Sequence, residues 1–407
     1  MASKDSILNA VKARETSIVN FTTKLVSIPT ENPPGKCYEE CVEAIAGELR
    51  SVGLEHEVVK IPGEYRSDDG EEYPRFALLA RYGSGEPKLH FHGHYDVVPA
   101  EDRTMFEPEI RNGQIHGRGS SDMKSGIAAM LYSIEALKVC DADLKGSVNL
   151  VIVPDEETGG ALGSRYLTET GLIARSGVGM LMAEPTSGVV WNANRGAISL
   201  LIRVKGIPMH VGLQHLGVNA FDKMVLVANA LMELKREVET RTTSYNLQPE
   251  SARRSIMMLG GRCEGGSNFN LVPGECSFTV DRRINPEEDL HTEKRRIYDL
   301  LDDMRNSGVD LEVEVLQEDR SAGVSEDTEV ARSLAQNVER ITGQRPSFEM
   351  CPGLLETRFY AANGIPAFAY GPGILSVSHG PSEFVPIQNV LDCTAVYALT
   401  ACDVLAS

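Results

Sequence analysis

The chain has 407 residues and a formal net charge of −18, with 42% hydrophobic and 24% charged residues. This composition is typical of a globular protein with a sizeable core, and the length indicates two domains or one domain with a large insertion. The acidic charge argues against nucleic acid or an anionic membrane as the main partner, because both require a basic face. It suits the attraction of divalent metal ions.

The sequence indicates neither a signal peptide nor a membrane span. Its first residues form an amphipathic pattern, and it contains no run of about eighteen apolar residues. The eight cysteines are scattered without a Cys-x-x-Cys pair, and Cys37 and Cys41 are most simply thiols on one helix. We therefore expect a cytoplasmic protein with reduced cysteines.

Helices and strands alternate in the first half of the chain. Apolar residues at helical spacing fill the first fifty residues and break at the Pro-rich loop 28–35. The strands that follow are expected at residues 75–82, 88–98, 147–153 and 178–183. The helices between them are expected at residues 123–138 and 162–170. This order is typical of an α/β sandwich with a largely parallel central sheet.

The pattern changes at about residue 197 to the order βαββαβ, the split-βαβ arrangement of a ferredoxin-like domain. The expected elements cover residues 198–204, 220–238, 255–260, 276–281, 286–305 and 311–316. Helices near residues 328–341 and 387–405 then resume the α/β pattern. We therefore expect a catalytic domain formed by residues 1–196 and 318–407, interrupted by an inserted domain at 197–317.

A histidine-rich strand is the first segment that points to chemistry. His90, His92 and His94 alternate along it and share one face, and Asp96 follows. His94 and Asp96 lie at the expected strand end, where His94 could bind a metal while Asp96 or a backbone group fixes its tautomer. His90 and His92 are either further ligands or buried core residues.

Three acidic signals follow apolar strands or a Gly-rich turn. Asp122 opens an expected helix, as either its N-cap or a metal ligand. Three consecutive carboxylates at 155–157 repel one another unless a cation or shared protons relieve the repulsion, a solvated turn being the alternative. Glu184 comes directly after another apolar strand. Each signal is weak when taken alone.

Taken together with Ser378-His379-Gly380-Pro381-Ser382-Glu383, these motifs closely resemble those of the zinc aminoacylase and carboxypeptidase family. That family includes acetylornithine deacetylase, succinyl-diaminopimelate desuccinylase and several dipeptidases. The resemblance spans nearly the whole chain, with the motifs in the same order. It implies a small N-acyl amino acid or short peptide as substrate, and a homodimer formed through the inserted lid domain.

The resemblance also implies two divalent metal ions, zinc first and cobalt or manganese as substitutes. Asp96 would orient a ligand, and Glu156 would be the general base that takes a proton from an activated water. Nitrogen and oxygen ligands without thiolates independently suit zinc. The implied ligands are a bridging Asp122, His94 and Glu184 on one metal, and Glu157 and His379 on the other.

Further positions match the family in the inserted domain and near the C-terminus. His210 resembles a histidine that crosses a dimer interface to stabilise the oxyanion, the alternative being an ordinary turn histidine. By resemblance, Asn270 and Arg283 would contact the substrate. Arg358 would either hold a substrate carboxylate or form a structural ion pair, and Gly373 would line the pocket.

The leading hypothesis is therefore a two-metal deacylase that cleaves the amide bond of an N-acyl-L-amino acid. A dipeptidase or carboxypeptidase would need the same site and a different pocket. A non-catalytic metal-binding relative would lack a ligand or the base, and none is missing here. A dehydrogenase is disfavoured, because Gly117-Arg118-Gly119 does not extend to a complete phosphate-binding Gly motif.

Overall fold

The computed structural model describes residues 3–63 and 70–406. The chain divides into two compact units. The first unit comprises Met1–Asn192, Val324–Glu349 and Glu356–Ser407, and the second comprises Ala193–Gly323 and Met350–Leu355. The first unit is therefore discontinuous in sequence.

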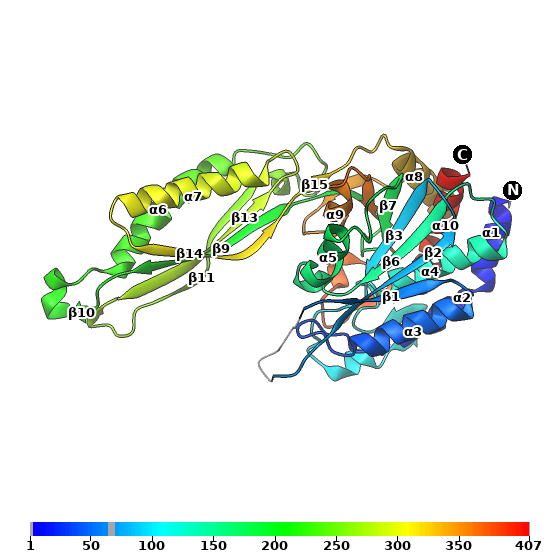
Figure 1. Ribbon diagram of the computed structural model, residues 1–407, viewed down its shortest axis with the longest axis horizontal. Helices are drawn as coiled ribbons and strands as arrows, with labels where there is room; N and C mark the ends of the chain where they lie inside the picture. The colour runs from blue at the N-terminus through cyan, green and yellow to red at the C-terminus, as the bar shows by residue number, and fades with distance from the viewer. Residues whose placement is uncertain (1–2, 64–69, 407) are drawn as a thin grey trace. The chain divides into compact units, whose positions relative to one another are not determined.

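The first unit is an α/β structure built on a mixed sheet with the strand order β1-β2-β6-β3-β7-β17-β8 (Figure 1). Its strands are β1 His56–Ile61, β2 Arg75–Gly83, β3 Lys88–His94, β6 Ser147–Val153, β7 Gly179–Met182, β8 Val190–Asn194, β16 Phe348–Cys351 and β17 Ala367–Ala369. A separate small sheet contains β4 Glu109–Arg111, β5 Gln114–His116 and β18 Phe384–Pro386. The helices are α1 Lys4–Ala13, α2 Glu15–Val26, α3 Tyr38–Ser51, α4 Lys124–Val139, α5 Tyr166–Glu169, α8 Glu329–Thr342, α9 Thr357–Ala361 and α10 Ile387–Leu405.

The expectation of a largely parallel sheet holds only in its middle. Strands β6, β3, β7 and β17 pair in parallel, whereas β1, β2 and β8 pair antiparallel with their neighbours. The parallel strands are joined by crossovers such as the one through α4, and the outer ones are not. The four parallel strands end at the same edge of the sheet, which is where chemistry gathers in α/β proteins.

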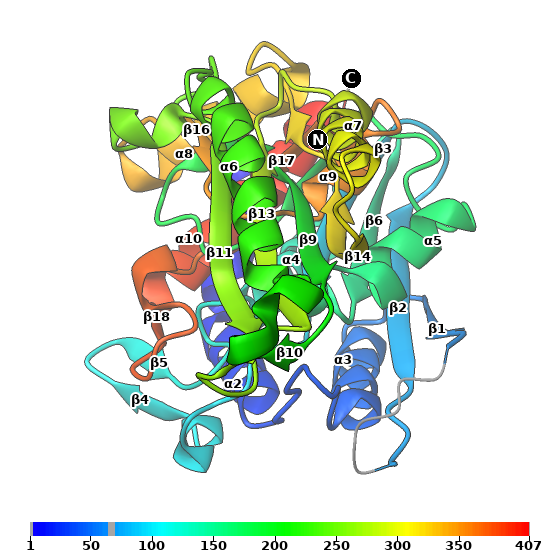
Figure 2. The same cartoon turned by 90° about the vertical axis from the view of Figure 1, so that its left-hand side faces the viewer.

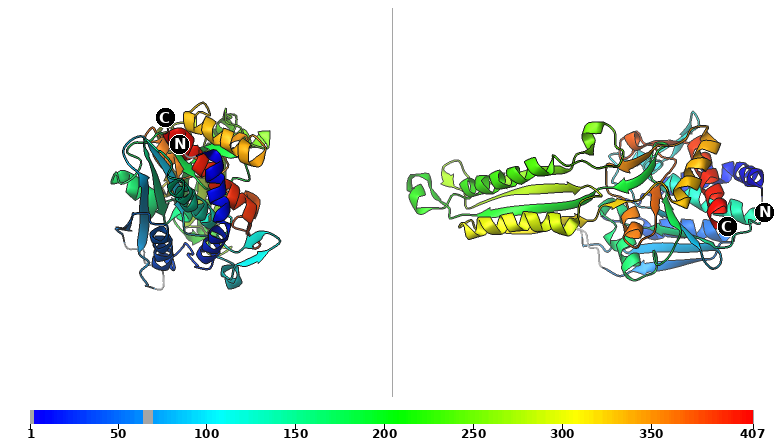
Figure 3. Two further views of the ribbon diagram at one scale, coloured as in Figure 1. Left: turned by 90° about the vertical axis from the view of Figure 1, so that its right-hand side faces the viewer. Right: turned by 90° about the horizontal axis from the view of Figure 1, so that it is seen from above.

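Helix α4 forms the centre of the hydrophobic core of the first unit. It is buried over nearly its whole length and packs on β3, β6, α2 and α10. The two terminal helices α1 and α10 lie side by side (Figure 3), joined by an ion pair of 2.7 Å between Lys4 and Asp403. Within the described residues, no helix combines the length and the apolar character needed to cross a membrane.

Two expected elements are shorter than the sequence pattern suggested. The strand expected at 88–98 ends at His94, because the chain then turns and Asp96 accepts backbone hydrogen bonds from another loop. The helix expected at 162–170 is reduced to a π-helical turn and the short α5. The backbone at Leu162 and Gly163 is not helical, and only a glycine fits at 163, where a Cβ would lie 2.2 Å from the carbonyl oxygen of Pro154.

The second unit contains a four-stranded antiparallel sheet with the order β11-β13-β9-β14. The sheet strands are β9 Gly196–Lys205, β11 Ile256–Gly265, β13 Glu275–Ile284 and β14 Leu311–Asp319. The helices are α6 Ala220–Val238, which lies along β11 and β13 (Figure 2), and α7 Leu290–Asn306. The short strands are β10 Met209–His210, β12 Leu271–Val272 and β15 Ala322–Gly323.

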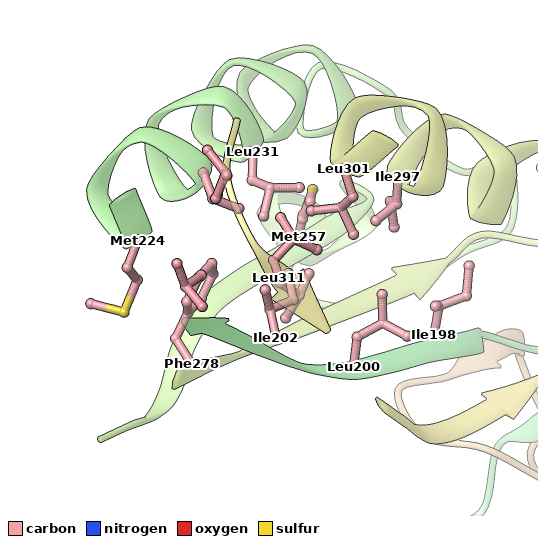
Figure 4. Close-up of a cluster of buried hydrophobic side chains, with 14 of the residues drawn as sticks. Ile198, Leu200, Ile202, Met224, Leu231, Met257, Phe278, Ile297, Leu301 and Leu311 are labelled. Carbon is pink, nitrogen blue, oxygen red and sulfur yellow. The ribbon is translucent and has the colours of Figure 1, made fainter. Parts of the chain in front are cut away.

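One face of this sheet and the two helices enclose a hydrophobic core. Strand side chains such as Ile202 and Phe278 point at helix side chains such as Leu231 and Leu301 (Figure 4). Alternation along β9 and β13 places these apolar residues on one face. Asn219 caps α6 by accepting the Phe221 and Asp222 backbone N–H groups.

Candidate metal centre

Strands β6, β3 and β7 are parallel neighbours in the sheet (Figure 1). Histidine and carboxylate residues stand at or directly after their ends. His94 is the last residue of β3, and Glu184 follows β7, which pairs directly with β3. Glu156 and Glu157 follow β6, the other neighbour of β3, in a short 3-10 turn. Strand pairing therefore brings together residues that are up to 90 positions apart in the sequence.

Asp122 lies at the centre of this group, in the turn that precedes α4. Its Oδ1 is 3.2 Å from His94 Nε2, and its Oδ2 is 3.2 Å from His379 Nε2. It does not cap α4, whose N-cap residue is Met123 without a side-chain hydrogen bond. The Asp122 carboxylate therefore does not cap the helix, and that alternative is wrong.

Two groups among the described residues could each hold a metal ion, and Asp122 belongs to both. In the first group, His94 Nε2 is also 3.7 Å from Glu184 Oε1. In the second, His379 Nε2 is 3.2 Å from Glu157 Oε1. The structure thus brings together all five residues that the family resemblance implies as ligands.

The donor set fits a cation. His94 Nε2 and Glu157 Oε1 are buried without a hydrogen bond of good geometry, although carboxylate or imidazole atoms lie nearby. Burial and the neighbouring carboxylates raise the pKa of Glu184 well above its usual range. Such a gathering of acidic groups in a buried place is costly unless positive charge relieves it.

The pKa values of both histidines are raised by the neighbouring carboxylates. The Asp122 and Glu157 carboxylates beside His379 raise its pKa to about 10. Burial opposes protonation of His94, but Asp122 and Asp96 raise its pKa well above the usual range. Burial alone would raise the pKa of Asp122, yet the two imidazoles hold it below its ordinary value. Positive charge is therefore favoured at both nitrogens that face Asp122.

Asp96 holds the loop that carries the two glutamates. Its carboxylate accepts the backbone N–H groups of Glu156 and Glu157 at 3.2 and 3.1 Å, and an N–H of Asn32 at 2.8 Å. Its backbone oxygen lies 3.0 Å from His94 Nδ1, which fixes the ring so that Nε2 faces Asp122. Asp96 therefore positions both His94 and the glutamate loop, and Asn32 is a partner that sequence reasoning missed.

Glu156 is placed differently from its neighbour. Within residues 3–63 and 70–406, no hydrogen bond or ion pair holds its half-buried carboxylate. Burial, followed by the charges of Glu157, Glu356 and Asp96, raises its pKa well above the usual range. This carboxylate has a raised pKa, has no fixed partner and lies beside residues that could hold a metal. Such a group is suited to accept a proton.

A match to a protein-family model shows the family of this chain. Residues 90–403 match the family described as peptidase family M20/M25/M40. The chain belongs to this peptidase family. As a member, it is a metal-dependent hydrolase that acts on amide bonds.

Two sequence relatives of this M20 peptidase carry the same name. Succinyl-diaminopimelate desuccinylase of Thioalkalivibrio sulfidiphilus is 29% identical over 372 residues, which cover 88% of this chain and 91% of the relative. The enzyme of that name from Marinobacter nauticus is 30% identical over 346 residues, which cover 81% of this chain and 86% of the relative.

Solved structures share the fold of this M20 peptidase at low sequence identity. The dipeptidase Dug1p of Saccharomyces cerevisiae matches with a TM-score of 0.76 at 15% identity, covering 100% of both chains. A metallo-carboxypeptidase of Sulfolobus solfataricus matches with a TM-score of 0.76 at 17% identity, covering 95% of this chain and 99% of the other.

Other nominated residues of the first unit lie against the glutamate and aspartate loops. Arg358 is buried and donates a hydrogen bond of 2.9 Å to the Gly159 carbonyl, on the loop that carries Glu156. Gly373 packs so closely that a Cβ there would lie 2.2 Å from the Ser121 carbonyl oxygen and 2.7 Å from Pro185. Both residues therefore support the backbone of segments that carry nominated ligands or the base.

His90 and His92 are buried away from the two metal-binding groups. His92 Nε2 lies 2.9 Å from Glu356 Oε2, and its Nδ1 lies 3.1 Å from the Tyr360 hydroxyl. His90 Nε2 lies 2.8 Å from the Ser176 carbonyl oxygen. Both side chains therefore have partners in the core, and neither belongs to the groups among the described residues that could hold a metal.

The remaining nominated residues lie in the second unit. His210 pairs with Leu271 in the ribbon formed by β10 and β12, and Val211 N–H donates to the Asn270 carbonyl at 2.9 Å. The exposed His210 accepts the Gly212 N–H at Nδ1, which leaves the proton of the neutral ring on Nε2. Arg283 is the penultimate residue of β13 and forms an ion pair of 2.7 Å with Asp281.

One buried ion pair in the first unit was missed by sequence reasoning. Arg118 and Glu383 lie within quoted motifs, but nothing in their spacing revealed that they meet. Their side chains are 2.7 Å apart and almost completely buried. Glu383 also accepts the backbone N–H of Asp122 at 3.0 Å.

Proposed function

We propose that this M20 peptidase is a two-metal hydrolase that removes the acyl group from an N-acyl-L-amino acid. One observation carries the proposal: the two oxygens of Asp122 face His94 and His379, each at 3.2 Å. A carboxylate placed in this way can bridge two ions. In this proposal Asp122, His94 and Glu184 hold one metal, and Asp122, Glu157 and His379 hold the other.

Zinc is the metal that we propose, with cobalt or manganese as substitutes, because the donors are imidazole and carboxylate without thiolate. Metal ions in such sites lower the pKa of a water molecule and polarise the substrate carbonyl. Side chains of the protein carry out proton transfer and positioning. Glu156 takes the proton of the attacking water and passes it to the leaving nitrogen. Asp96 keeps His94 and the glutamate loop in place.

The substrate class rests on the relatives. Two relatives that align with most of the chain are named succinyl-diaminopimelate desuccinylase, which supports an N-acyl amino acid over a peptide. A dipeptidase or carboxypeptidase is the alternative, supported by the names of the similar solved structures. A non-catalytic relative is disfavoured, because the metal-binding groups and Glu156 are all present.

We also propose that residues 197–317 are a ferredoxin-like lid inserted between residues 1–196 and 318–407. The element order and the strand order β11-β13-β9-β14 of the second unit support this assignment. Exposed apolar side chains on α6 and on the edge strand β11, such as Phe221, Leu226 and Met258, support a homodimer through the lid.

In this dimer, His210 of the partner subunit donates a hydrogen bond to the oxyanion of the tetrahedral intermediate. Its exposed ring and its Nε2 proton suit that role. Asn270, which lies beside His210 in the ribbon, and Arg283 would contact the substrate. Arg358, in α9, would hold a substrate carboxylate, and Gly373 would line the pocket.

A substrate panel tests the proposal. N-acetyl, N-succinyl and N-formyl amino acids are incubated beside dipeptides, with metal-free protein and with added zinc, cobalt or manganese. We expect metal-dependent release of a free amino acid from one acyl class. Turnover of dipeptides alone would favour the peptidase alternative. An absence of turnover with two metals bound would contradict the deacylase assignment.

A further inference from the structure

The buried pair Arg118–Glu383 joins two segments that lie far apart in the sequence. Arg118 belongs to the Gly-rich turn before α4, and Glu383 follows the His379 loop at the start of β18. Arg118 Nη1 is 2.7 Å from Glu383 Oε2, and the two side chains are 2% and 0% exposed. Neither residue belongs to the groups that could hold a metal.

Each member of the pair forms hydrogen bonds with the backbone of the other segment. Glu383 Oε1 accepts the N–H groups of Ser121 and Asp122 at 2.9 and 3.0 Å. Arg118 donates to the carbonyl oxygens of His379 and Gly380 at 3.2 and 3.3 Å. One ion pair therefore fixes the backbones of two of the three residues in the second metal-binding group, Asp122 and His379.

Stability alone is a poor explanation for this pair. Removing two charges from water costs several kcal/mol each, so a buried ion pair often contributes little net stability. Burial raises the pKa of Glu383, which reflects that cost. A positioning role accounts for the pair better than stability does. The planar guanidinium holds two carbonyl groups, and the carboxylate holds two N–H groups.

We propose that Arg118 and Glu383 are positioning residues, which we name the Arg118–Glu383 clamp, that hold Asp122 and His379 at the spacing needed to bind one metal ion. The clamp rests on the proposed two-metal function. It sets the affinity for the metal held by Asp122, Glu157 and His379. Groups that orient metal ligands typically change metal affinity by about 10–100-fold when they are lost.

The clamp predicts unequal loss of the two metals, because His379 belongs to only one of the two groups. Glu383→Gln keeps the size of the side chain and one acceptor oxygen, but removes the charge and turns an amide N–H₂ towards Arg118 or the backbone N–H groups. Arg118→Lys keeps the positive charge and removes the fork that reaches two carbonyls. Zinc is titrated into the metal-free full chain by calorimetry, and metal per chain is measured after dialysis against buffered free zinc.

We expect wild type to bind two zinc ions, and both variants to bind one of them about 10–100-fold more weakly. The affinity for the other ion should fall by a smaller factor, because the clamp holds only one of its nominated ligands, the shared Asp122. Glu293→Gln is the matched control, since it breaks the buried pair with Arg282 in the second unit. It should lower the melting temperature of the metal-free protein and leave both zinc affinities unchanged.

Three results would overturn the clamp. In the first, Glu383→Gln and Arg118→Lys bind both zinc ions as wild type does, and lose only melting temperature, as the control does. In the second, both zinc affinities fall equally in every variant, the control included. In the third, wild type itself binds fewer than two zinc ions, which overturns the proposed two-metal function and the clamp with it. If Glu383→Gln does not fold, Arg118→Lys decides between these outcomes.

Discussion

Glu156 and Glu157 are adjacent in the chain, yet their carboxylates have different surroundings. Asp96 accepts both backbone N–H groups and so fixes the turn that separates the two side chains. Glu157 then faces His379, while no hydrogen bond or ion pair within the described residues holds the Glu156 carboxylate. One loop can in this way supply a ligand and a base at successive positions.

Glu156→Ala should therefore abolish turnover without emptying the metal site. Loss of a general base typically lowers kcat by about 10²–10⁴-fold. Zinc content, measured by elemental analysis, should stay near wild type. Glu157→Ala is the control and should lower the zinc content, because it removes a nominated ligand. If Glu156→Ala loses zinc and Glu157→Ala keeps it, the two roles have been exchanged.

At individual positions, the sequence predicts residues that stand directly beside strand ends and turns. His94, Asp122, Glu157, Glu184 and His379 stand in such motifs, and the structure brings them together. The contacts of Asn32, Arg118 and Glu383 carry no such signal. Each of these contacts joins residues at least 60 positions apart. The order of the strands in the sheet brings such residues together, and a local sequence pattern does not reveal that order.

Among the helices and strands, long periodic segments were predictable and short ones were not. The patterns at 220–238 and 387–405 predicted α6 and α10 with their observed bounds. Short strands such as β1, β8 and β17 have too few residues for a period to stand out, and sheet pairing defines them. Because some of these strands are antiparallel, missing them led to the overestimate of parallel pairing.

The charged network just before α7 makes the folding stability of the second unit depend on pH. Glu288 forms an ion pair of 2.6 Å with Arg282 and accepts the Ser255 hydroxyl at 2.6 Å. Burial alone would raise the pKa of Glu288, but Ser255 and Arg282 lower it below its ordinary value. The ionised carboxylate therefore stabilises the fold above the unfolded glutamate pKa of about 4.3.

Glu288→Gln should cost about 1–3 kcal/mol at pH 7, or several degrees of melting temperature. The stabilisation by Glu288 is lost as the pH falls through its lowered folded pKa. The gap between wild type and variant should therefore narrow from pH 6 to pH 3. Calorimetric melts of the metal-free protein measure it, with Glu233→Gln on the exposed face of α6 as the control. A gap that stays constant with pH would contradict this origin.

At the scale of the whole molecule, the exposed apolar side chains of the second unit form the surface that we propose for the dimer. Phe221 and Leu226 on α6, and Met258 on the edge strand β11, are each about half exposed to solvent. An edge strand and an apolar helix face on one unit are suited to pairing with a second copy of the same surface. Such a dimer would make catalysis a property of two chains, if His210 acts on the partner's metal site.

Mixing inactive variants tests this arrangement. Equal amounts of His210→Ala and Glu156→Ala chains are exchanged, and turnover is measured on the substrate identified by the panel. Half of the dimers are then mixed, and each mixed dimer has one intact site. Activity should therefore return to about a quarter of the wild-type value.

The control mixes wild type with the double variant His210→Ala and Glu156→Ala. If His210 acts across the interface, each mixed dimer has no intact site, so exchange should halve the activity of the mixture. If His210 acts within its own chain, exchange should leave that activity unchanged, and the first mixture should stay inactive. Mass spectrometry of intact dimers shows whether the chains have exchanged, so a lack of recovery in exchanged dimers would contradict the role of His210 across the interface.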